Sequence, residues 1–319
     1  MTKRPIDIIC AGELLIDLIG HQMNVNLSET DRFQRHLGGS PINVAINGSR
    51  LGMQTQVAAT CGHDGLGAFA LKTLSESGVH CQSIRQVESP TSVILISKST
   101  GTPDFTAYRM ADSQLILSQL PDDIWHQTRF FHFSCFALSQ EPARSTLLEW
   151  AQKAIDSGTQ LTIDVNYSEA IWPNKEEAIA VLKNVMKWRP FVKMSEDDAQ
   201  RIFGQTMDES ALFSLLHDWG ADQVCYTKGA KGVSLSQKGT QPISLPAIPI
   251  TQIQDATGAG DAFWTGYLHA QIQGLSPQKS VQWAQHIAAI KLQYVGHLPT
   301  NIDYEQLMHT FKLSFGNER

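Results

Sequence analysis

The sequence predicts a doubly wound α/β fold, with a parallel sheet flanked by helices and a small antiparallel β lid. Three observations support this. Short apolar runs alternate with helix-like segments along most of the chain, two stretches with strand-like alternation interrupt that order, and the length of 319 residues allows one large domain with an appendage, or two domains.

The strand-like runs come at regular intervals and are separated by segments with helical patterning. The runs occupy residues 6–10, 56–59, 130–133, 161–165, 191–194 and 223–227. The helix-like segments cover residues 43–51, 67–77, 142–157, 175–187 and 208–219. Helices of this length suit right-handed crossovers that cover both faces of a parallel sheet. Residues 241–254 are rich in Gln and Pro and predict a loop with an edge hairpin.

Residues 14–37 and 87–110 depart from this order and contain strand-like alternation, for example Ser92-Val-Ile-Leu-Ile-Ser. We expect the two stretches to pair in a small sheet that covers a ligand site; two unrelated surface hairpins are the alternative. The predicted units are therefore residues 1–12, 38–86 and 111–319 for the α/β domain, and residues 13–37 and 87–110 for the lid.

Composition restricts the class of protein. A net charge of −6 argues against nucleic acid as a partner, because such proteins need a basic surface. Five widely spaced cysteines without a Cys-x-x-Cys pair predict reduced, buried thiols. No apolar run approaches the roughly 20 residues of a membrane span, and no secretory h-region precedes the first strand, so we expect a cytoplasmic protein without a membrane partner.

The most informative motif is Asp255-Ala-Thr-Gly258-Ala259-Gly260-Asp261. Its small residues allow successive N–H groups to turn towards one point, at the positive N-terminus of a helix. That helix is indicated by the spacing of Ala262, Phe263, Gly266, Tyr267 and Ala270. The motif predicts a phosphoryl-transfer site in which Asp261 takes the proton of an acceptor hydroxyl. The alternative is an ordinary loop in which Asp261 only caps the helix.

A second motif, Gly38-Gly39-Ser40-Pro41-Ile42-Asn43, follows the first interruption. Glycines without a Cβ allow a ligand to approach the backbone, and the Asn43 amide offers both donor and acceptor groups to sugar hydroxyls. A glycine turn followed by a helix cap is the alternative.

With Gly12-Glu-Leu-Leu-Ile-Asp17, the two motifs make the chain resemble the ribokinase (PfkB) family of carbohydrate kinases over nearly its whole length. The resemblance implies a ribokinase-like α/β domain, a β lid, ATP as phosphoryl donor and Mg²⁺. It implies that Asp261 is the general base and that Gly258, Ala259 and Gly260 form an anion hole. It also suggests a homodimer formed through the lid. The sequence contains no Walker A lysine loop, so a P-loop kinase is not supported.

The resemblance also implies positions for the nucleotide and for cations. Thr227-Lys228-Gly229-Ala-Lys231-Gly232 resembles the segment that lines the nucleotide, with a hairpin turn as the alternative. Ser195-Glu-Asp-Asp198 stands where many relatives have Asn-x-x-Glu, which supports Mg²⁺ and phosphate through water. Asp255 and Thr257 match positions whose backbone carbonyls bind a monovalent cation such as K⁺ in some members.

Two further segments resemble parts of the sugar site. Asp164-Val-Asn166-Tyr-Ser168 is similar to an Asp-x-Asn-x-Arg stretch of fructokinase-type and sugar-acid kinases, with Ser168 in place of the Arg. Tyr108-Arg109-Met-Ala-Asp112 resembles the Tyr-Arg-x-x-Ala-Asp segment of kinases for fructose and for oxidised or deoxy sugars. Arg109 suits either a neutral ketohexose or a sugar acid. Its alternative role is an exposed lid arginine paired with Asp104 or Asp112.

Asp17 favours fructose, because a carboxylate accepts hydrogen bonds from hydroxyls but repels an acid. The expected function is ATP-dependent phosphorylation of a sugar primary hydroxyl. The alternatives are a kinase for 2-keto-3-deoxygluconate or another sugar or nucleoside, and a non-catalytic sugar-sensing homologue suggested by Ser168 and Ser195. A Rossmann oxidoreductase is disfavoured because Cys10-Ala-Gly12-Glu-Leu-Leu lacks Gly-x-Gly-x-x-Gly.

Overall fold

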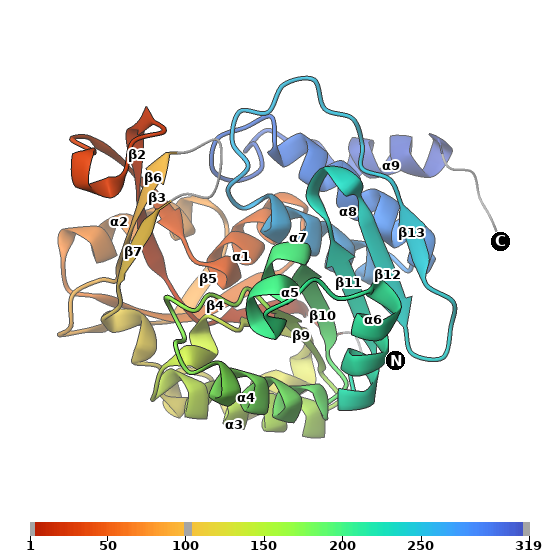
Figure 1. Ribbon diagram of the computed structural model, residues 1–319. Coiled ribbons are helices and arrows are strands. Elements are labelled where there is room, and N and C mark those ends of the chain that lie inside the picture. Colours follow the sequence, from red (N-terminus) through yellow and green to blue (C-terminus); the bar gives the residue numbers. More distant parts are fainter. Residues whose placement is uncertain (1–3, 99–103, 315–319) are drawn as a thin grey trace.

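The computed structural model describes residues 4–98 and 104–314 (Figure 1). Residues 99–103 of the predicted lid and both ends of the predicted α/β unit, residues 1–3 and 315–319, lie outside the described residues. In the described part, nine strands form one large sheet and four form a smaller one. The doubly wound α/β prediction is confirmed.

The large sheet is parallel over most of its width. Its spatial order is β13 (Ile243–Leu245), β12 (Val233–Gln237), β11 (Gln223–Thr227), β10 (Phe191–Ser195), β9 (Gln160–Asp164), β8 (Thr128–Ser134), β1 (Ile6–Ala11), β4 (Thr55–Gly62) and β5 (His80–Val87). At one edge, β12 pairs antiparallel with both β11 and β13. The six predicted strands are all present. Their continuous apolar runs reflect burial on both faces.

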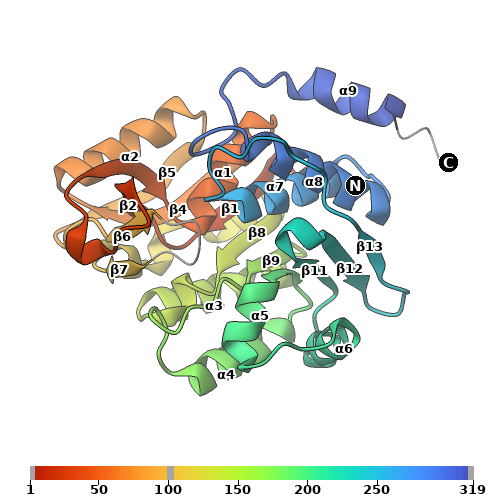
Figure 2. The same ribbon diagram turned by 45° about the horizontal axis from the view of Figure 1, so that its top comes forward.

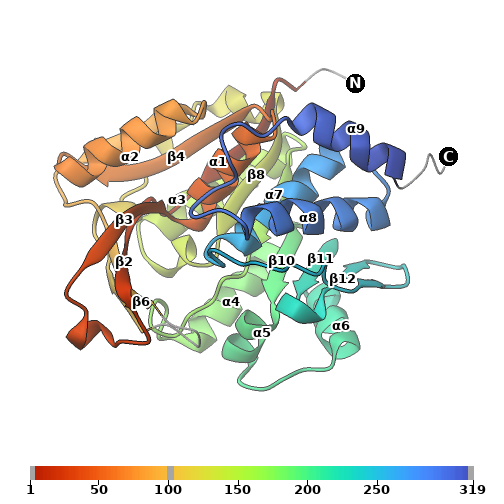
Figure 3. The same ribbon diagram turned by 90° about the horizontal axis from the view of Figure 1, so that it is seen from above.

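Helices cover both faces of the sheet (Figures 1 and 3). One face packs against α3 (Ala143–Asp156), α4 (Lys175–Met186), α5 (Glu196–Phe203) and α6 (Glu209–Trp219). The other packs against α1 (Ser40–Arg50), α2 (Gly65–Glu76), α7 (Ala259–Ile272) and α8 (Pro277–Lys291), with α9 (Tyr304–Ser314) outside α7 and α8. Short 3₁₀ turns occur at Leu27–Glu29, Ala111–Ser113, Leu117–Gln119, Asp122–Gln127, Ala137–Ser139 and Gly229–Lys231.

Polar residues at the helix starts explain several boundaries. The Asp64 side chain accepts the N–H groups of Leu66 and Gly67 and so caps α2. Asn174 and Asp208 cap α4 and α6 in the same way. Each cap satisfies backbone donors that have no partner within the helix.

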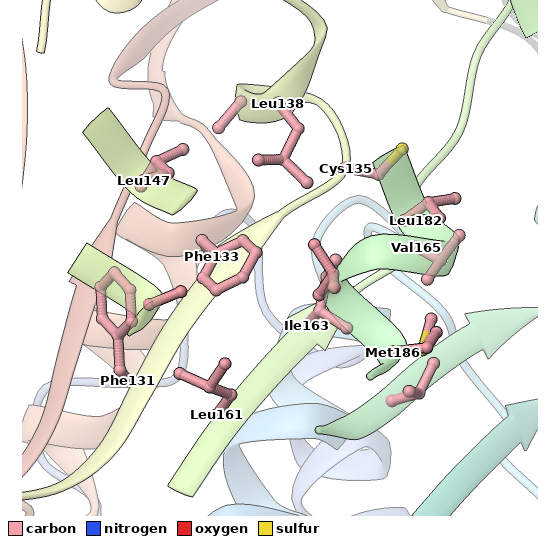
Figure 4. Close-up of a cluster of buried hydrophobic side chains, with 14 of the residues drawn as sticks. Phe131, Phe133, Cys135, Leu138, Leu147, Leu161, Ile163, Val165, Leu182 and Met186 are labelled. Atoms are coloured by element: carbon pink, nitrogen blue, oxygen red, sulfur yellow. The ribbon is translucent and has the colours of Figure 1, made fainter. Parts of the chain in front are cut away.

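The core between the sheet and α3 and α4 is shown in Figure 4. Phe131 and Phe133 of β8 and Ile163 of β9 are completely buried there, together with Leu147 of α3. Burial of each such side chain contributes about 1.5–3 kcal/mol to the stability of the fold. All five cysteines are unpaired, and only Cys81 is partly exposed, in agreement with the expected reduced thiols.

The lid contains β2 (Leu15–Met23), β3 (Phe33–Gly38), β6 (Val93–Lys98) and β7 (Phe105–Tyr108), in the order β3-β2-β6-β7. Figure 2 shows this sheet at one side of the molecule, beside α2. The predicted pairing of the two stretches is confirmed, and the alternative of unrelated hairpins is wrong. The predicted boundaries between the two units stay a prediction.

The two antiparallel hairpins of the lid are joined by a parallel contact between β2 and β6, which the sequence analysis did not foresee. The contact follows from topology: β2 and β6 continue from β1 and β5, two parallel strands that end at the same edge of the large sheet. Within the described ranges, no helix has the length and apolar character needed to cross a membrane.

Candidate active site

The candidate site lies at the carboxyl edge of the large sheet. In the sheet, β1 lies between β4 and β8. The chain first adds β4 and β5 on one side of β1 and then continues with β8 on the other side, so the strand order reverses at β1. Crevices at such reversal points, outside the carboxyl ends of the strands, are the usual ligand sites of open α/β sheets. The first turns of α1 and α7 also meet here, as Figure 3 shows.

Asp261, in the first turn of α7, is held by two side chains of α1. Ser40 Oγ donates to Asp261 Oδ1 at 2.7 Å, and Asn43 Nδ2 donates to Asp261 Oδ2 at 2.7 Å. Ser40 Oγ also lies 3.3 Å from Asp164 Oδ2. Because the hydroxyl has one hydrogen, its shorter contact with Asp261 is the better hydrogen bond. The carboxylate is therefore oriented before any substrate binds.

The predicted anion hole is the N-terminus of α7. Gly258 is its N-cap and adopts φ 73°, a left-handed conformation that glycine tolerates without strain. Gly260 and Asp261 follow in the first turn, where N–H groups have no helical partner and the helix dipole is positive. The Ala259 N–H donates to the Ala256 carbonyl at 3.2 Å, so it is already used within the loop.

A buried lysine that the sequence analysis missed stands beside this cradle. Lys193 Nζ donates to both oxygens of Asp164 at 3.0 Å, and it lies 3.0 Å from the place that a Cβ on Gly260 would take. Burial alone would lower the pKa of Lys193, but Asp164, Asp198 and Asp261 raise it above its usual value. A lysine within the apolar run 191–194 was the available signal, because a buried charge needs a partner.

The carboxylates around Lys193 hold protons more tightly than usual. Burial raises the pKa of Asp261, against the opposing effects of Lys193, Ser40 and Asn43. Burial also raises the pKa of Asp164, which Lys193 opposes. The pKa of Glu13 rises to about 8 for the same reason, although its oxygens accept the Ser40 N–H at 3.1 Å and the Ser134 hydroxyl at 2.6 Å.

A hollow separates the lid from the start of α7. Its lining residues come from β2, β3, α1, the Asp255 loop and the segment after α8: Asp17, Ile19, His36, Leu37, Asn43, Asp255, Thr257, Gly258, Gly296 and His297. Burial, with a further effect of the Asp261 charge, raises the pKa of Asp17 to about 7. The structure thus gathers residues predicted from three distant motifs around one space.

Both glycines of the second motif are required by the protein itself. A Cβ on Gly38 would lie 2.2 Å from Asp17 Oδ2, and one on Gly39 would lie 2.2 Å from the Glu13 carbonyl oxygen. Gly39 is the N-cap of α1 and has φ 102°. We expected a ligand to approach the backbone of these glycines. In the structure, Asp17 of the lid and Glu13 of the β1–β2 connection already occupy that space.

His297 is a second residue that sequence patterning did not identify, because no other histidine is spaced with it. The Asn43 amide nitrogen donates to Asp261, so Asn43 Oδ1 is the acceptor for His297 Nε2 at 2.9 Å. Burial lowers the pKa of His297 to about 3, so the ring is neutral with its proton on Nε2. His297 thereby fixes the orientation of the Asn43 amide.

Tyr108 and Arg109 do not line the hollow. Tyr108 is 55% exposed. Arg109 Nε and Nη2 donate to Asp112 Oδ2 at 2.9 and 2.6 Å, and its guanidinium lies 4.3 Å from the centre of the Phe136 ring. The pairing of Arg109 with Asp112 agrees with the alternative role given in the sequence analysis. The exposed position expected for that role is wrong, because the two side chains are only 5% and 0% exposed. Asn166 Oδ1 accepts the Phe136 N–H at 3.0 Å and orders the same connection.

Ser195 and Asp198 form the capping box of α5. Asp198 Oδ2 accepts Ser195 N–H at 3.1 Å and Ser195 Oγ–H at 2.5 Å, and burial raises the Asp198 pKa to about 6. A water-mediated contact with Mg²⁺ fits this engaged carboxylate better than direct ligation. Among the described residues, no group of three or more His, Cys, Asp or Glu side chains could hold a metal.

Residues 227–232 form the turn of the β11–β12 hairpin, as the alternative predicted. Lys228 Nζ donates to Glu209 Oε1 at 2.5 Å and to Ser234 Oγ at 2.9 Å, so its charge is engaged within the protein. A Cβ on Gly232 would lie 2.1 Å from the Leu245 carbonyl oxygen, whereas the space beside Gly229 is open. The backbone at Gly229 is therefore uncovered, and Thr227 ends β11 two residues before it.

Phosphoryl transfer to a hydroxyl is the chemistry that suits a buried carboxylate beside a positive helix N-terminus, because it requires a base and oriented donors rather than a covalent intermediate. The fold and the site together define a small-molecule kinase. The chain belongs to the pfkB family of carbohydrate kinases, whose family model matches residues 6–302.

Individual relatives agree with this assignment. The chain is 33% identical to an ATP-dependent 6-phosphofructokinase of Thermoanaerobacterium thermosaccharolyticum, over 96% of this chain and 94% of that protein. The structure of Halothermothrix orenii fructokinase is 31% identical, with a TM-score of 0.79 over 92% of this chain and all of the other. A Pyrococcus horikoshii sugar kinase in complex with ATP is 27% identical, with a TM-score of 0.82 over 95% and 97% of the two chains. The protein is an ATP-dependent carbohydrate kinase.

Proposed function

We propose that this chain transfers the γ-phosphoryl group of ATP to a primary hydroxyl of fructose, with Asp261 as the general base. The hydroxyl oxygen forms a bond to the γ-phosphorus, the bond from that phosphorus to the β–γ bridging oxygen breaks, and the hydroxyl proton passes to the Asp261 carboxylate. The hydrogen bonds from Ser40 and Asn43 support this role, because they fix the carboxylate while it still has lone pairs available.

The charge on the moving phosphoryl group is met by the α7 N-terminus and by Lys193. Lys193 is close to Gly260 and is held in place by Asp164. Preorganised donors and charges of this kind stabilise a transition state without reorganising during the reaction. Bound Mg²⁺ would neutralise part of the phosphate charge.

The observation that supports a neutral sugar is the charge of the hollow. Its lining contains the carboxylates of Asp17 and Asp255 and, among the described residues, neither lysine nor arginine. Asp255 already accepts hydrogen bonds from Lys291, Thr257 and Gly296. Sugar hydroxyls would therefore donate to Asp17, whose charged form would repel a second phosphate or a sugar carboxylate. Arg109, the cation expected to receive a sugar acid, is already paired with Asp112.

A coupled ADP-release assay tests the proposal. The panel contains fructose, fructose 6-phosphate, ribose, 2-keto-3-deoxygluconate, tagatose and nucleosides. Fructose should give the highest kcat/KM. A higher value for fructose 6-phosphate would transfer the assignment to the activity named for the Thermoanaerobacterium relative. Binding of sugar and ATP without ADP release from any compound would favour the sensor alternative.

Replacement of the base tests the role of Asp261. We expect Asp261→Asn to lower kcat by about 10²–10⁴-fold, the usual contribution of a general base, while calorimetry still detects fructose and ATP binding. Asp156→Asn is the matched control, because Asp156 is exposed at the end of α3, where its carboxylate accepts a hydrogen bond from Gln152. A kcat for Asp261→Asn close to that of the wild type would exclude Asp261 as the base.

A further inference from the structure

Lys291, the last residue of α8, is buried against the loop that leads into α7. Its side chain is 0% exposed. Lys291 Nζ donates to the Asp255 carbonyl oxygen at 2.9 Å and to Asp255 Oδ2 at 3.1 Å. A lysine placed in this way brings a positive charge to a backbone oxygen and to a carboxylate of the same residue.

Further hydrogen bonds of Asp255 and Gln254 attach the same loop to the protein. Asp255 Oδ1 accepts the Thr257 N–H at 2.9 Å, and Oδ2 also accepts the Gly296 N–H at 3.1 Å. The Gln254 N–H donates to the Leu292 carbonyl at 2.9 Å. The loop before the anion hole is therefore attached to the end of α8 and to the segment that follows it.

The resemblance to the pfkB family suggested a monovalent cation bound to the Asp255 and Thr257 carbonyls. The residues present do not fit such an ion. Such an ion exchanges its hydration shell for several protein oxygens, including carbonyls. The Asp255 carbonyl already receives the Lys291 ammonium. A metal ion on the same oxygen would stand next to that ammonium, and the two positive charges would repel each other.

We propose that the Lys291 ammonium is a built-in cation that takes the place of a monovalent metal ion at this loop, so that the kinase does not require K⁺. The part of this inference that concerns catalysis rests on the proposed function; the part that concerns ion binding does not. Lys291 donates to the Asp255 carbonyl, one of the two backbone oxygens that would hold an ion, and to the carboxylate of the same residue.

The position of Lys291 connects it to the reaction. Its Cε lies 4.0 Å from the place that a Cβ on Gly258 would take, directly behind the anion hole. Lys291 is a positioning residue in this arrangement, because it acts on the phosphoryl group through the loop that carries Gly258. Small displacements of such a loop have large effects on rate.

The first experiment uses the unmodified protein. The thermal midpoint and kcat are measured in KCl, NaCl and choline chloride at equal ionic strength. We expect the same midpoint in all three salts, because a protein that binds no specific ion gains no linkage stabilisation, and kcat values within about twofold. A higher midpoint in KCl alone, or activation by K⁺ of about fivefold or more, would overturn the proposal.

The second experiment opens the ammonium position. Lys291→Ala should have a lower midpoint in choline chloride and recover part of it in KCl or NH₄Cl, because an ion can enter the vacated space. Lys291→Met should not recover, since its side chain fills that space without a charge. Lys153→Ala, which removes a lysine on the surface of α3, controls for net charge.

The outcomes separate the proposals. No response of Lys291→Ala to KCl or NH₄Cl, or an equal response of Lys291→Met, would contradict ion replacement. Should neither variant fold, the salt comparison on the wild type still decides. The thermal readout needs no sugar, so an incorrect assignment of fructose would leave it unchanged.

Discussion

At the scale of single residues, the site is defined by how its buried carboxylates are satisfied. Asp261 receives hydrogen bonds from Ser40 and Asn43, and Asp164 receives two from Lys193. Among the described residues, no side chain donates such a hydrogen bond to the Asp17 carboxylate. Burial and the Asp261 charge raise the pKa of Asp17 to about 7. Asp17 is therefore the carboxylate with most to gain from sugar hydroxyls.

Ser40 should tune the base rather than act as one. We predict that Ser40→Ala lowers kcat about tenfold, because loss of one charge-assisted hydrogen bond of about 1.5 kcal/mol leaves Asp261 less well oriented. Ser49→Ala is the control on the same helix, since Ser49 donates to the Ser77 carbonyl, outside the site. Steady-state kinetics with fructose measures both. Equal kcat values for the two variants would contradict the role of Ser40.

Asp17 should make the stability of the empty protein depend on pH. Its pKa is 3.8 in the reference state and about 7 in the fold, so the folded state binds more protons than the unfolded state between these values. This stabilisation is complete below pH 3.8 and is lost as the pH rises to about 7.

Asp17→Asn removes this dependence. We predict that its gain in unfolding free energy over the wild type grows from pH 4 to pH 7 and then levels, reaching about 1–2 kcal/mol because Asp17 is partly exposed. Urea titrations without sugar measure the gain. A gain that is independent of pH would show that Asp17 is not the titrating group. With fructose present, the same variant should have a raised KM.

At the scale of elements, the strand ends bring the site together. β10, β9, β8 and β1 are successive parallel strands of the large sheet, so their carboxyl ends place Ser195, Asp164 and Glu13 along one edge. The lid strands β2 and β3 add Asp17 and Gly38 from above. Within the lid, the Asp17 side chain lies close against the Gly38 backbone.

Gly38 tests this contact. Its backbone is not in the left-handed region, so a methyl group would cause no backbone strain but would meet the Asp17 carboxylate at 2.2 Å. We predict that Gly38→Ala turns Asp17 away and raises the KM for fructose about tenfold, with little loss of stability, as expected for loss of a charged hydrogen bond. Gly65→Ala is the control, because nothing lies within 4 Å of its added methyl. Equal KM values would contradict the placement of Asp17 in the sugar site.

At the scale of the whole molecule, the lid is held to the α/β domain by a buried ion pair. Arg109 follows β7 and pairs with Asp112, while its guanidinium lies over Phe136 in the connection after β8. A lid fixed in this way can exclude water from the hollow when sugar binds and so limit the hydrolysis of ATP.

Loss of the Asp112 charge should weaken this attachment. We predict that Asp112→Asn lowers the unfolding free energy by about 3–5 kcal/mol, because Arg109 remains buried without its counter-charge. It should also raise ATP hydrolysis relative to sugar phosphorylation. Asp122→Asn is the control, because its pair with Lys153 is on the surface, with Asp122 81% exposed. Urea denaturation and a two-substrate ADP assay measure the two effects; equal stability losses would contradict the model.

Assembly and location stay predictions at this scale. A homodimer through the lid is testable by sedimentation. The exposed side chains to substitute are those of Tyr108, the last residue of β7, and Met110, just beyond it. The cytoplasmic location and the lack of nucleic-acid or membrane partners likewise rest on composition and apolar patterning.

The sequence by itself determined the sheet, the lid and the principal motifs. Apolar runs predict strands such as β1 and β8 because burial on both faces favours apolar residues at consecutive positions. The glycine-flanked motif predicts Asp261 at a helix N-terminus, since such loops require small residues and helical spacing follows. The sequence analysis did not foresee β5, β12, α5, α8 and α9. β5 is only half buried at an edge, and α5 is short and begins with three acidic residues.

Only the tertiary structure decided which charges meet. Lys193, Lys291 and His297 carry no motif of their own, and each becomes part of the site through a partner far away in the chain: Asp164, Asp255 and Asn43. The same is true of Arg109, whose role as a buried anchor depends on Phe136 and Asp112. The physical reason is that hydropathy patterns record which face of an element is buried, whereas the partner of a buried charge is set by how distant elements pack together.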